Sequence, residues 1–257
     1  MDQLCKFPKL PDKYDYALRE AVAFVLERFK PVGIIAAGTI VRGTPDATSD
    51  LDVWVIHLEP MRQRIQKFFN GVPAEIFLNP PWVIQNYFIQ DQATARPISA
   101  HMMATGAVIL ATDPVVERLR KNAISLLGSR PTPNPQTLTQ TRYAAATRLE
   151  DAMDVAERSP AAANMLASEA VRQMLYFAFM KAGQFIPRDK DLLNAFESMD
   201  SRIASQVQLF FESANCKERL RLANEIADRI LEVRGFFEWS SEPETVPPPD
   251  SSASIPS

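Results

Sequence analysis

The sequence predicts an α/β (α+β) domain built on a small mixed sheet, followed by an all-α helical bundle. In the first half, short apolar runs alternate with amphipathic segments, which is typical of strands covered by helices. After about residue 135 the chain is rich in Ala, Leu, Met, Glu and Arg and poor in β-branched residues, which favours helices. The Pro- and Gly-containing segment 128–135, GSRPTPNP, separates these two patterns. We therefore expect domains at 1–129 and 130–239 and a disordered, Pro- and Ser-rich tail at 240–257.

The first domain is expected to begin with an amphipathic helix at 12–29, which Asp12 can cap. The apolar runs that predict strands lie at 32–37, 51–58, 72–78 and 106–111. Helices are expected at 61–70, where Gly71 provides a stop, and at 81–91. Asp113 and Pro114 predict a helix start, because Asp is a good cap and Pro is tolerated in the first turn, and this helix should run through Leu127.

The second domain is expected to contain about four helices. Their predicted ranges are 136–158, 161–183, 189–212 and 216–234. The third is expected to break near Asp200, and Gly235 is expected to terminate the fourth. The second is apolar on most sides, which predicts that it is the buried one.

Residues 33–57, GIIAAGTIVRGTPDATSDLDVWVIH, carry the strongest functional pattern. An apolar run ends in Gly38-Thr39, a turn-rich segment follows, and Asp50 and Asp52 lead into the next apolar run. Side chains at alternate positions of a strand point to the same face. The two carboxylates should therefore repel each other unless a cation lies between them. Their oxygens suit magnesium or manganese, and a metal site beside a Gly-hydroxyl turn is suited to binding phosphate.

This spacing resembles the signature of the DNA polymerase beta-like nucleotidyltransferase superfamily, in which Gly-Ser is followed by about ten residues and then Asp-x-Asp. Here ten residues (40–49) separate Gly38-Thr39 from Asp50-Leu51-Asp52, and Thr39 keeps the hydroxyl. The superfamily carries a third carboxylate on a later strand, a position that Glu75 matches within VPAEIFLN. An α/β domain followed by helices is also similar to the small-molecule, aminoglycoside-type branch.

The resemblance implies a role for each matched residue. Metal binding and catalysis fall to Asp50, Asp52 and Glu75, and nucleotide binding falls to Gly38, Thr39, Arg42 and Lys190. The implied cofactor is Mg²⁺ or Mn²⁺, and the implied substrate is a nucleoside triphosphate, with AMP from ATP transferred to a hydroxyl of a small-molecule acceptor. The structural alternatives are a solvated strand end for the Asp pair, an exposed strand position for Glu75, and surface positions for Arg42 and Lys190.

An acidic cluster on the first helix of the bundle is a candidate for the general base. It comprises Glu150, Asp151 and Asp154, and Glu150 and Asp154 share a helix face. The alternative is an ordinary solvated face. His57 and His101 have no partner at metal-ligand spacing, so we expect structural roles for both.

The composition limits the expected partners and location. The net charge of −3 supplies no global basic field, so nucleic acid is an unlikely partner. Cys5 and Cys216 match no metal spacing, and neither a signal peptide nor a membrane span is expected, which favours a cytoplasmic protein. A homodimer is plausible. The alternative function is an antitoxin-like nucleotidyltransferase that modifies or binds a protein partner. A HEPN-type ribonuclease is disfavoured because no His follows His101.

Overall fold

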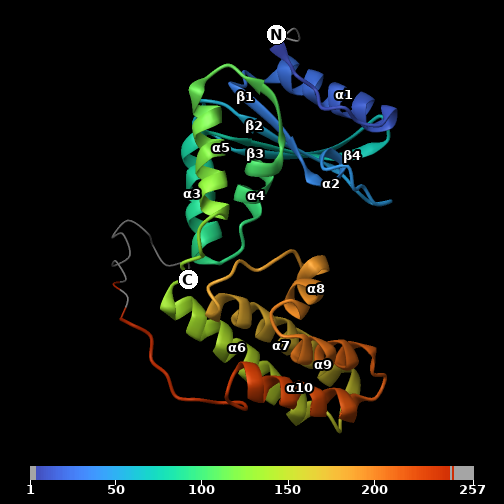
Figure 1. Cartoon of the computed structure of the whole chain (residues 1–257), viewed down its shortest axis with the longest axis vertical. Coiled ribbons are helices and arrows are strands. Elements are labelled where there is room, and N and C mark those ends of the chain that lie inside the picture. Colours follow the sequence, from blue (N-terminus) through green and yellow to red (C-terminus); the bar gives the residue numbers. More distant parts are fainter. Residues whose placement is uncertain (1–3, 244, 246–257) are drawn as a thin grey trace, which may run out of the picture. The chain divides into compact units, whose positions relative to one another are not determined.

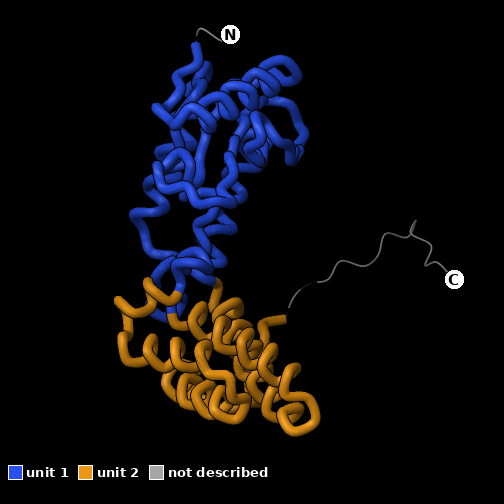
Figure 2. The backbone as a smooth tube through the Cα atoms, turned by 90° about the vertical axis from the view of Figure 1, so that its right-hand side faces the viewer, with its two compact units in different colours: residues 1–133, 179–192 blue, residues 134–178, 193–257 orange. Residues whose placement is uncertain are grey.

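The computed structural model describes residues 4–243 and 245, which form two compact units (Figure 2). The first unit consists of Met1–Pro133 together with Phe179–Leu192. The second consists of Asn134–Ala178 and the residues from Leu193 onward. The chain therefore leaves the first unit after Pro133, returns to it for a short segment after most of the helix α7 (Pro160–Lys181), and leaves it again after Leu192.

The first unit is built on a five-stranded mixed sheet with the order β3-β4-β2-β1-β5 (Figure 1). The strands are β1 (Gly33–Ala37), β2 (Leu51–Ile56), β3 (Gln63–Phe69), β4 (Val72–Asn79) and β5 (Ala107–Ala111). Only β2 and β4 pair in parallel, and the other neighbours are antiparallel. The expected α/β domain with a small mixed sheet is confirmed, and so are the four strands predicted from apolar runs.

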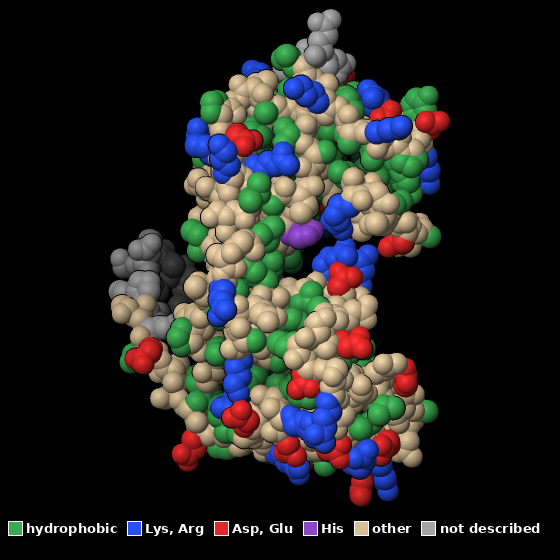
Figure 3. All heavy atoms as spheres, viewed as in Figure 1, with side chains coloured by type: hydrophobic (Ala, Val, Ile, Leu, Met, Phe, Trp, Pro, Cys, Tyr) green, Lys and Arg blue, Asp and Glu red, His purple; other side chains and the backbone are tan. Residues whose placement is uncertain are grey.

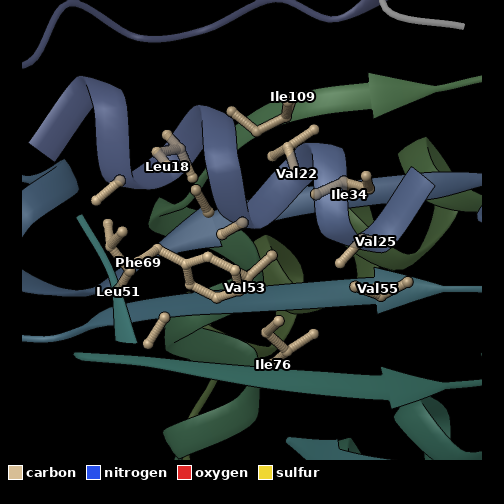
Figure 4. Packing of buried hydrophobic residues seen from close by; sticks show 14 of the residues in the cluster. Leu18, Val22, Val25, Ile34, Leu51, Val53, Val55, Phe69, Ile76 and Ile109 are labelled. Atoms are coloured by element: carbon tan, nitrogen blue, oxygen red, sulfur yellow. The ribbon is translucent and has the colours of Figure 1, made fainter. Parts of the chain in front are cut away.

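Helices cover both faces of the sheet, because successive strand residues alternate between the faces. Ile34, Val53 and Val55 pack toward helix α1 (Asp12–Arg28), with Leu18 and Val22 on its buried side (Figure 4). On the opposite face, Ile35, Trp54 and Ile56 join a cluster with residues of three helices. These helices are α3 (Pro81–Ala93), α4 (Ile98–Thr105) and α5 (Pro114–Leu127).

The helix predicted at 61–70 is wrong, because most of this segment forms β3, an edge strand. Asn70 and Gly71 have φ angles of 45° and 70°, and Phe69 pairs with Val72. An Asn-Gly pair with two positive φ angles is a favoured two-residue hairpin turn, so Gly71 closes a hairpin rather than ending a helix. β3 shows little apolar alternation because only Phe69 is buried on it.

Two helix ends test the capping predictions in opposite directions. Asp113 caps α5 as expected, accepting a hydrogen bond from the Val115 N–H at 2.7 Å. Asp12 does not cap α1, because the helix begins one residue earlier than the cap prediction requires: Pro11 is the cap residue and Asp12 lies in the first turn. The short helices α2 (Gly38–Val41) and α4 were not predicted.

The second unit is all-helical, which confirms the predicted bundle. Its helices are α6 (Pro135–Val155), most of α7, α8 (Leu192–Glu197), α9 (Ser201–Glu212) and α10 (Cys216–Ile230). The break near Asp200 is confirmed, since its carboxylate caps α9 by accepting from the Arg202 and Ile203 N–H groups. The stop at Gly235 is wrong, because α10 already ends at Ile230 and Glu232 takes the left-handed conformation, with φ 59°.

Charged side chains of both signs intermix over α10 (Figure 3), where Arg221 pairs with Glu218 at 2.6 Å and also with Glu225. This pattern is typical of a solvated helix surface. The expected disordered tail at 240–257 lies largely outside the described residues, and 240–243 and 245 have no regular secondary structure. Among the helices of the described part of the chain, none combines the length and apolar character needed to cross a membrane.

Candidate active site

The site begins where β1 ends, at a glycine that the geometry requires. Gly38 has φ 91°, in the left-handed region that favours glycine. A Cβ atom at this position would lie 2.8 Å from Asp52 Oδ2. The turn therefore brings the backbone of Gly38 directly against a carboxylate that leads β2.

Three carboxylates meet at this end of the sheet. Asp52 on β2 is paired in register with Glu75 on the parallel strand β4, and Asp50 comes just before β2. One carboxylate oxygen from each of Asp50, Asp52 and Glu75 lies within 4.8 Å of the others. The three residues that the sequence singled out for metal binding are thus brought together. Asp52 and Glu75 are 23 residues apart in the chain, and the parallel pairing of β2 with β4 makes them neighbours.

The electrostatics of the triad fit a hard cation. Burial, together with the negative charges of Asp50 and Glu75, raises the pKa of Asp52 to about 6, against which Arg42 and Arg64 act. Clustered like charges that raise a pKa are relieved by a cation bound between them. An all-carboxylate oxygen donor set suits Mg²⁺ or Mn²⁺.

Two side chains of the edge strand β3 hold Glu75. Arg64 Nη2 donates to both Glu75 oxygens, at 2.7 and 2.6 Å, and Gln66 Nε2 also donates to Oε1. Across the β3–β4 ladder, Gln66 is the register partner of Glu75. The third carboxylate is therefore oriented by the hairpin that the sequence did not predict.

The segment between Gly38 and Asp50 folds back onto the turn. Thr39 Oγ1 and Ser49 Oγ are 2.8 Å apart, and the Thr44 N–H donates to the Thr39 carbonyl at 2.9 Å. Asp46 accepts hydrogen bonds from the hydroxyls of Thr48 and Ser49. These contacts fix the Thr39 hydroxyl beside the carboxylates.

A cavity of about 670 Å³ opens at this turn, and we call it the nucleotide cavity after the ligand proposed for it below. Gly38, Thr39, Arg42, Asp50 and Asp52 line it, so it contains most of the residues that the sequence pattern selected. Its volume is within the usual range for small-molecule sites.

Residues 186–191, which the chain contributes after its excursion into the second unit, form another wall of the nucleotide cavity. Lys190 Nζ lies 3.3 Å from Asp46 Oδ2, so Lys190 lines this cavity as a residue of the first unit. Ile186 N–H donates to the Ala95 carbonyl at 2.7 Å, and Arg96 pairs with Asp189 at 3.2 Å. This wall is thereby fixed to the segment between α3 and α4.

A second cavity, of about 590 Å³, lies beside Glu75, and we call it the aromatic cavity. Ile98 and Met102 line both cavities. The other residues of the aromatic cavity are Trp54, Arg62, Gln63, Arg64, Phe77, Asn79, Tyr87 and Ser99. The nucleotide cavity contains Asp50 and Asp52 and the aromatic cavity contains Glu75, so the triad joins the two.

The remaining sequence candidates lie elsewhere. Glu150, Asp151 and Asp154 are exposed on α6, in the second unit. His57 is buried, and neither of its ring nitrogens has a hydrogen-bond partner within the described residues. Burial lowers the pKa of His57, which favours the neutral ring and a structural role. His101 lines the nucleotide cavity, and burial together with Arg42 and Arg188 lowers its pKa.

From the sequence we did not identify Arg64, Gln66 or Arg188 as site residues, nor the rings that line the aromatic cavity. Arg188 stands two residues before Lys190 in the PRDKDLL segment, so it carried the same local signal. Arg64 and Gln66 were placed on a helix, where their alternation toward one strand face could not be recognised. The Asn-Gly pair at 70–71 was the signal that would have corrected this.

No protein-family model and no curated protein matches the sequence. Among solved structures, the chain is similar to a nucleotidyltransferase-like protein from Exiguobacterium sibiricum 255-15. The TM-score is 0.54, the sequence identity is 14%, and the similarity covers 84% of this chain and 73% of that one. At this identity the similarity is evidence of a shared fold. The chain therefore has the fold of a nucleotidyltransferase-like protein, with an acidic triad able to hold a divalent metal at the edge of its sheet.

Proposed function

We propose that this protein is a metal-dependent nucleotidyltransferase that moves AMP from ATP to a hydroxyl group of a small molecule. The observation that carries the proposal is the triad of Asp50, Asp52 and Glu75, in which Asp52 meets the Gly38 turn and both aspartates line the nucleotide cavity. The fold similarity to a nucleotidyltransferase-like protein supports the same reaction class.

The proposed reaction is an in-line displacement. The acceptor oxygen forms a bond to the α-phosphorus, the bond from that phosphorus to the bridging oxygen breaks, pyrophosphate leaves, and the hydroxyl proton passes to a base or to water. Divalent metal ions would neutralise the attacking and leaving oxygens. Asp50 and Asp52 would hold the metal, and Glu75 would complete the ligand set on the side of the acceptor.

The nucleotide cavity offers matching groups for the triphosphate. The Gly38 backbone permits close approach, and the Thr39 hydroxyl and N–H would bind a terminal phosphate. Arg42 and Lys190 would pair with phosphate oxygens, since both line the same cavity. Lys190 would exchange Asp46 for phosphate, a modest cost because their ion pair is exposed.

The first test is metal-dependent binding of ATP, measured by calorimetry on the wild-type chain and on Asp52→Asn. The wild type should bind ATP more tightly when Mg²⁺ or Mn²⁺ is added, because the triphosphate completes a metal shell that the carboxylates begin. Asp52→Asn removes one ligand charge at nearly constant shape, so the metal-dependent gain in affinity should fall by about tenfold or more. The matched control is Asp12→Asn, which makes the same change at an exposed position in the first turn of α1.

The proposal fails if none of ATP, GTP, CTP and UTP binds the wild-type chain with either metal present. It also fails if Asp52→Asn binds ATP with metal as tightly as Asp12→Asn does. The separate suggestion of a base among Glu150, Asp151 and Asp154 is tested by their amide variants, which should bind ATP normally and transfer slowly if one of them accepts the proton.

A further inference from the structure

The aromatic cavity has a position and a composition that the proposed nucleotide site does not use. It adjoins the nucleotide cavity along Ile98 and Met102, and it contains Glu75, whose carboxylate lies within 4.8 Å of Asp50 and Asp52. A nucleotide bound at Gly38 and Thr39 would therefore leave the aromatic cavity open beside the metal triad. A hydroxyl placed there would lie next to the metal ligands, where an attacking oxygen is needed.

Aromatic side chains form one wall of this cavity. Trp54 and Phe77 are stacked with centroids 5.4 Å apart, and Tyr87 meets Trp54 edge-on at 6.2 Å. Phe77 and Tyr87 are half-buried, whereas Trp54 is almost fully buried. Such a wall can pack against a planar ring, since aromatic pairs gain energy beyond the area that they bury.

The charges of the cavity are mainly positive. Arg62 and Arg64 line it, against a single carboxylate, Glu75, which Arg64 already holds at 2.6 Å and which the metal would also neutralise. Within the described part of the chain, Arg62 forms no ion pair, and its side-chain contact is a long one, 3.4 Å from Nη1 to the Tyr87 hydroxyl. The remaining N–H groups of Arg62 can bind a carboxylate or a phosphate in two-point fashion.

We propose that the aromatic cavity is the acceptor site, and that the acceptor is an anionic hydroxyl compound with an aromatic or other planar ring. The ring packs on Phe77 and Tyr87, the anionic group pairs with Arg62, and the hydroxyl points toward Glu75. This assignment rests on the proposed nucleotidyl transfer. It disfavours a polycation such as an aminoglycoside at this site, because Arg62, whose charge no ion pair offsets within the described residues, would repel it.

The test uses two probes that share a hydroxymethylphenyl group and carry opposite charges: 4-(hydroxymethyl)benzoate and 4-(hydroxymethyl)benzylamine. Their binding to the full chain is measured by ligand-observed NMR titration with Mg²⁺ and α,β-methylene-ATP present, so that the nucleotide cavity is filled. We expect the benzoate to bind at least about threefold more tightly than the amine, on the scale of a partly exposed charge pair.

Charge reversal locates the effect. Arg62→Glu should abolish the preference for the benzoate or invert it. Arg118→Glu, an exposed position on α5 that lines neither cavity, should keep the wild-type preference. The saturated analogue 4-(hydroxymethyl)cyclohexanecarboxylate should bind more weakly than the benzoate, because it cannot pack flat on the rings.

The inference is overturned if neither probe binds, if the amine binds as tightly as the benzoate, or if Arg62→Glu behaves like Arg118→Glu. Equal binding of the saturated analogue overturns the planar-ring requirement. Binding of the ATP analogue is recorded in the same samples. If it binds and the benzoate does not, the acceptor assignment fails and the proposed function stands. If the benzoate binds at Arg62 and the ATP analogue does not, the proposed function fails and the acceptor role falls with it.

Discussion

At the scale of single residues, Gly38 is the position where backbone conformation and the proposed metal site depend on each other. Its φ of 91° and the 2.8 Å that would separate a Cβ from Asp52 Oδ2 leave no room for a side chain. We expect Gly38→Ala to lose about 1–3 kcal/mol of unfolding free energy through backbone strain, and to displace the Asp52 carboxylate. Metal-dependent ATP binding should therefore weaken by about tenfold or more, as measured by calorimetry beside urea unfolding.

Gly43→Ala separates the two effects. Gly43 also has a positive φ, 78°, but a Cβ there would meet nothing within 4 Å. This variant should lose a similar unfolding free energy through backbone strain and keep its ATP affinity to within about twofold. If both glycine variants bind ATP like the wild type, the close approach of Gly38 to Asp52 has no role in the site.

At the scale of elements, Asp91 links the two helices α3 and α4. Its carboxylate lies in the last turn of α3 and accepts a hydrogen bond from the Ala100 N–H, at 2.8 Å, in the first turn of α4. This donor would otherwise be unsatisfied at the start of the helix. Because α4 carries His101 and Met102 to the nucleotide cavity, Asp91 positions one wall of that cavity.

The environment of Asp91 predicts a pH dependence of stability. Burial raises the pKa of Asp91 to about 6, from an ordinary value of 3.8, although the nearby backbone N–H groups of Ala100, Ser99 and Ile98 act against the rise. Since the folded state binds this proton more tightly than the unfolded state, the stabilisation is complete below about pH 4 and is lost as the pH rises through about 6. Asp91→Asn cannot titrate and retains one acceptor oxygen. Relative to wild type, it should gain about 1–2 kcal/mol of unfolding free energy between pH 4 and pH 7.

Urea unfolding of both proteins across this pH range measures that difference in unfolding free energy. The pH dependence that comes from the other carboxylates is common to both proteins, so it cancels in the comparison. A difference between Asp91→Asn and wild type that does not change with pH would show that Asp91 titrates normally in the folded protein.

At the scale of the whole molecule, the chain returns from the second unit to complete the first. Residues 179–192 belong to the first unit, and Arg188 and Lys190 line the nucleotide cavity. A boundary drawn at Ser129 from composition leaves these residues out. The helical unit is therefore formed by two stretches of the chain, one before and one after the segment that returns to the first unit.

We expect the double substitution of Arg188→Ala and Lys190→Ala to weaken ATP binding by about five- to tenfold. Two cations are lost, and Asp46 and Asp191, their ion-pair partners, are left to repel the triphosphate. The salt dependence of ATP affinity should fall as well. The control is Arg202→Ala with Lys217→Ala, which removes the same charges from exposed positions of the second unit. Equal ATP affinity in the two double variants, measured by calorimetry, would contradict a role for the returning segment.

The sequence by itself determined the parts of this protein that depend on neighbours in the chain. Alternate positions on a strand share a face, so Asp50 and Asp52 could be paired without a structure. The Gly38-Thr39 turn, the Asp113 cap, the strands of the sheet core and the helical second half follow equally local rules. The Asn70-Gly71 hairpin was also readable locally, and the weak apolar alternation of an edge strand concealed it.

Only the tertiary structure decided which distant residues share a site. The parallel pairing of β2 with β4 brings Glu75 into register with Asp52, and the β3 hairpin sets Arg64 against Glu75. The return of residues 179–192 to the first unit closes the nucleotide cavity, and the ring wall of the aromatic cavity comes from β2, β4 and α3. No periodic pattern in the sequence indicates these contacts, because they arise from how the sheet and its helices pack. The local pattern therefore identifies the proposed chemistry, and the packing forms the cavities that would select its substrates.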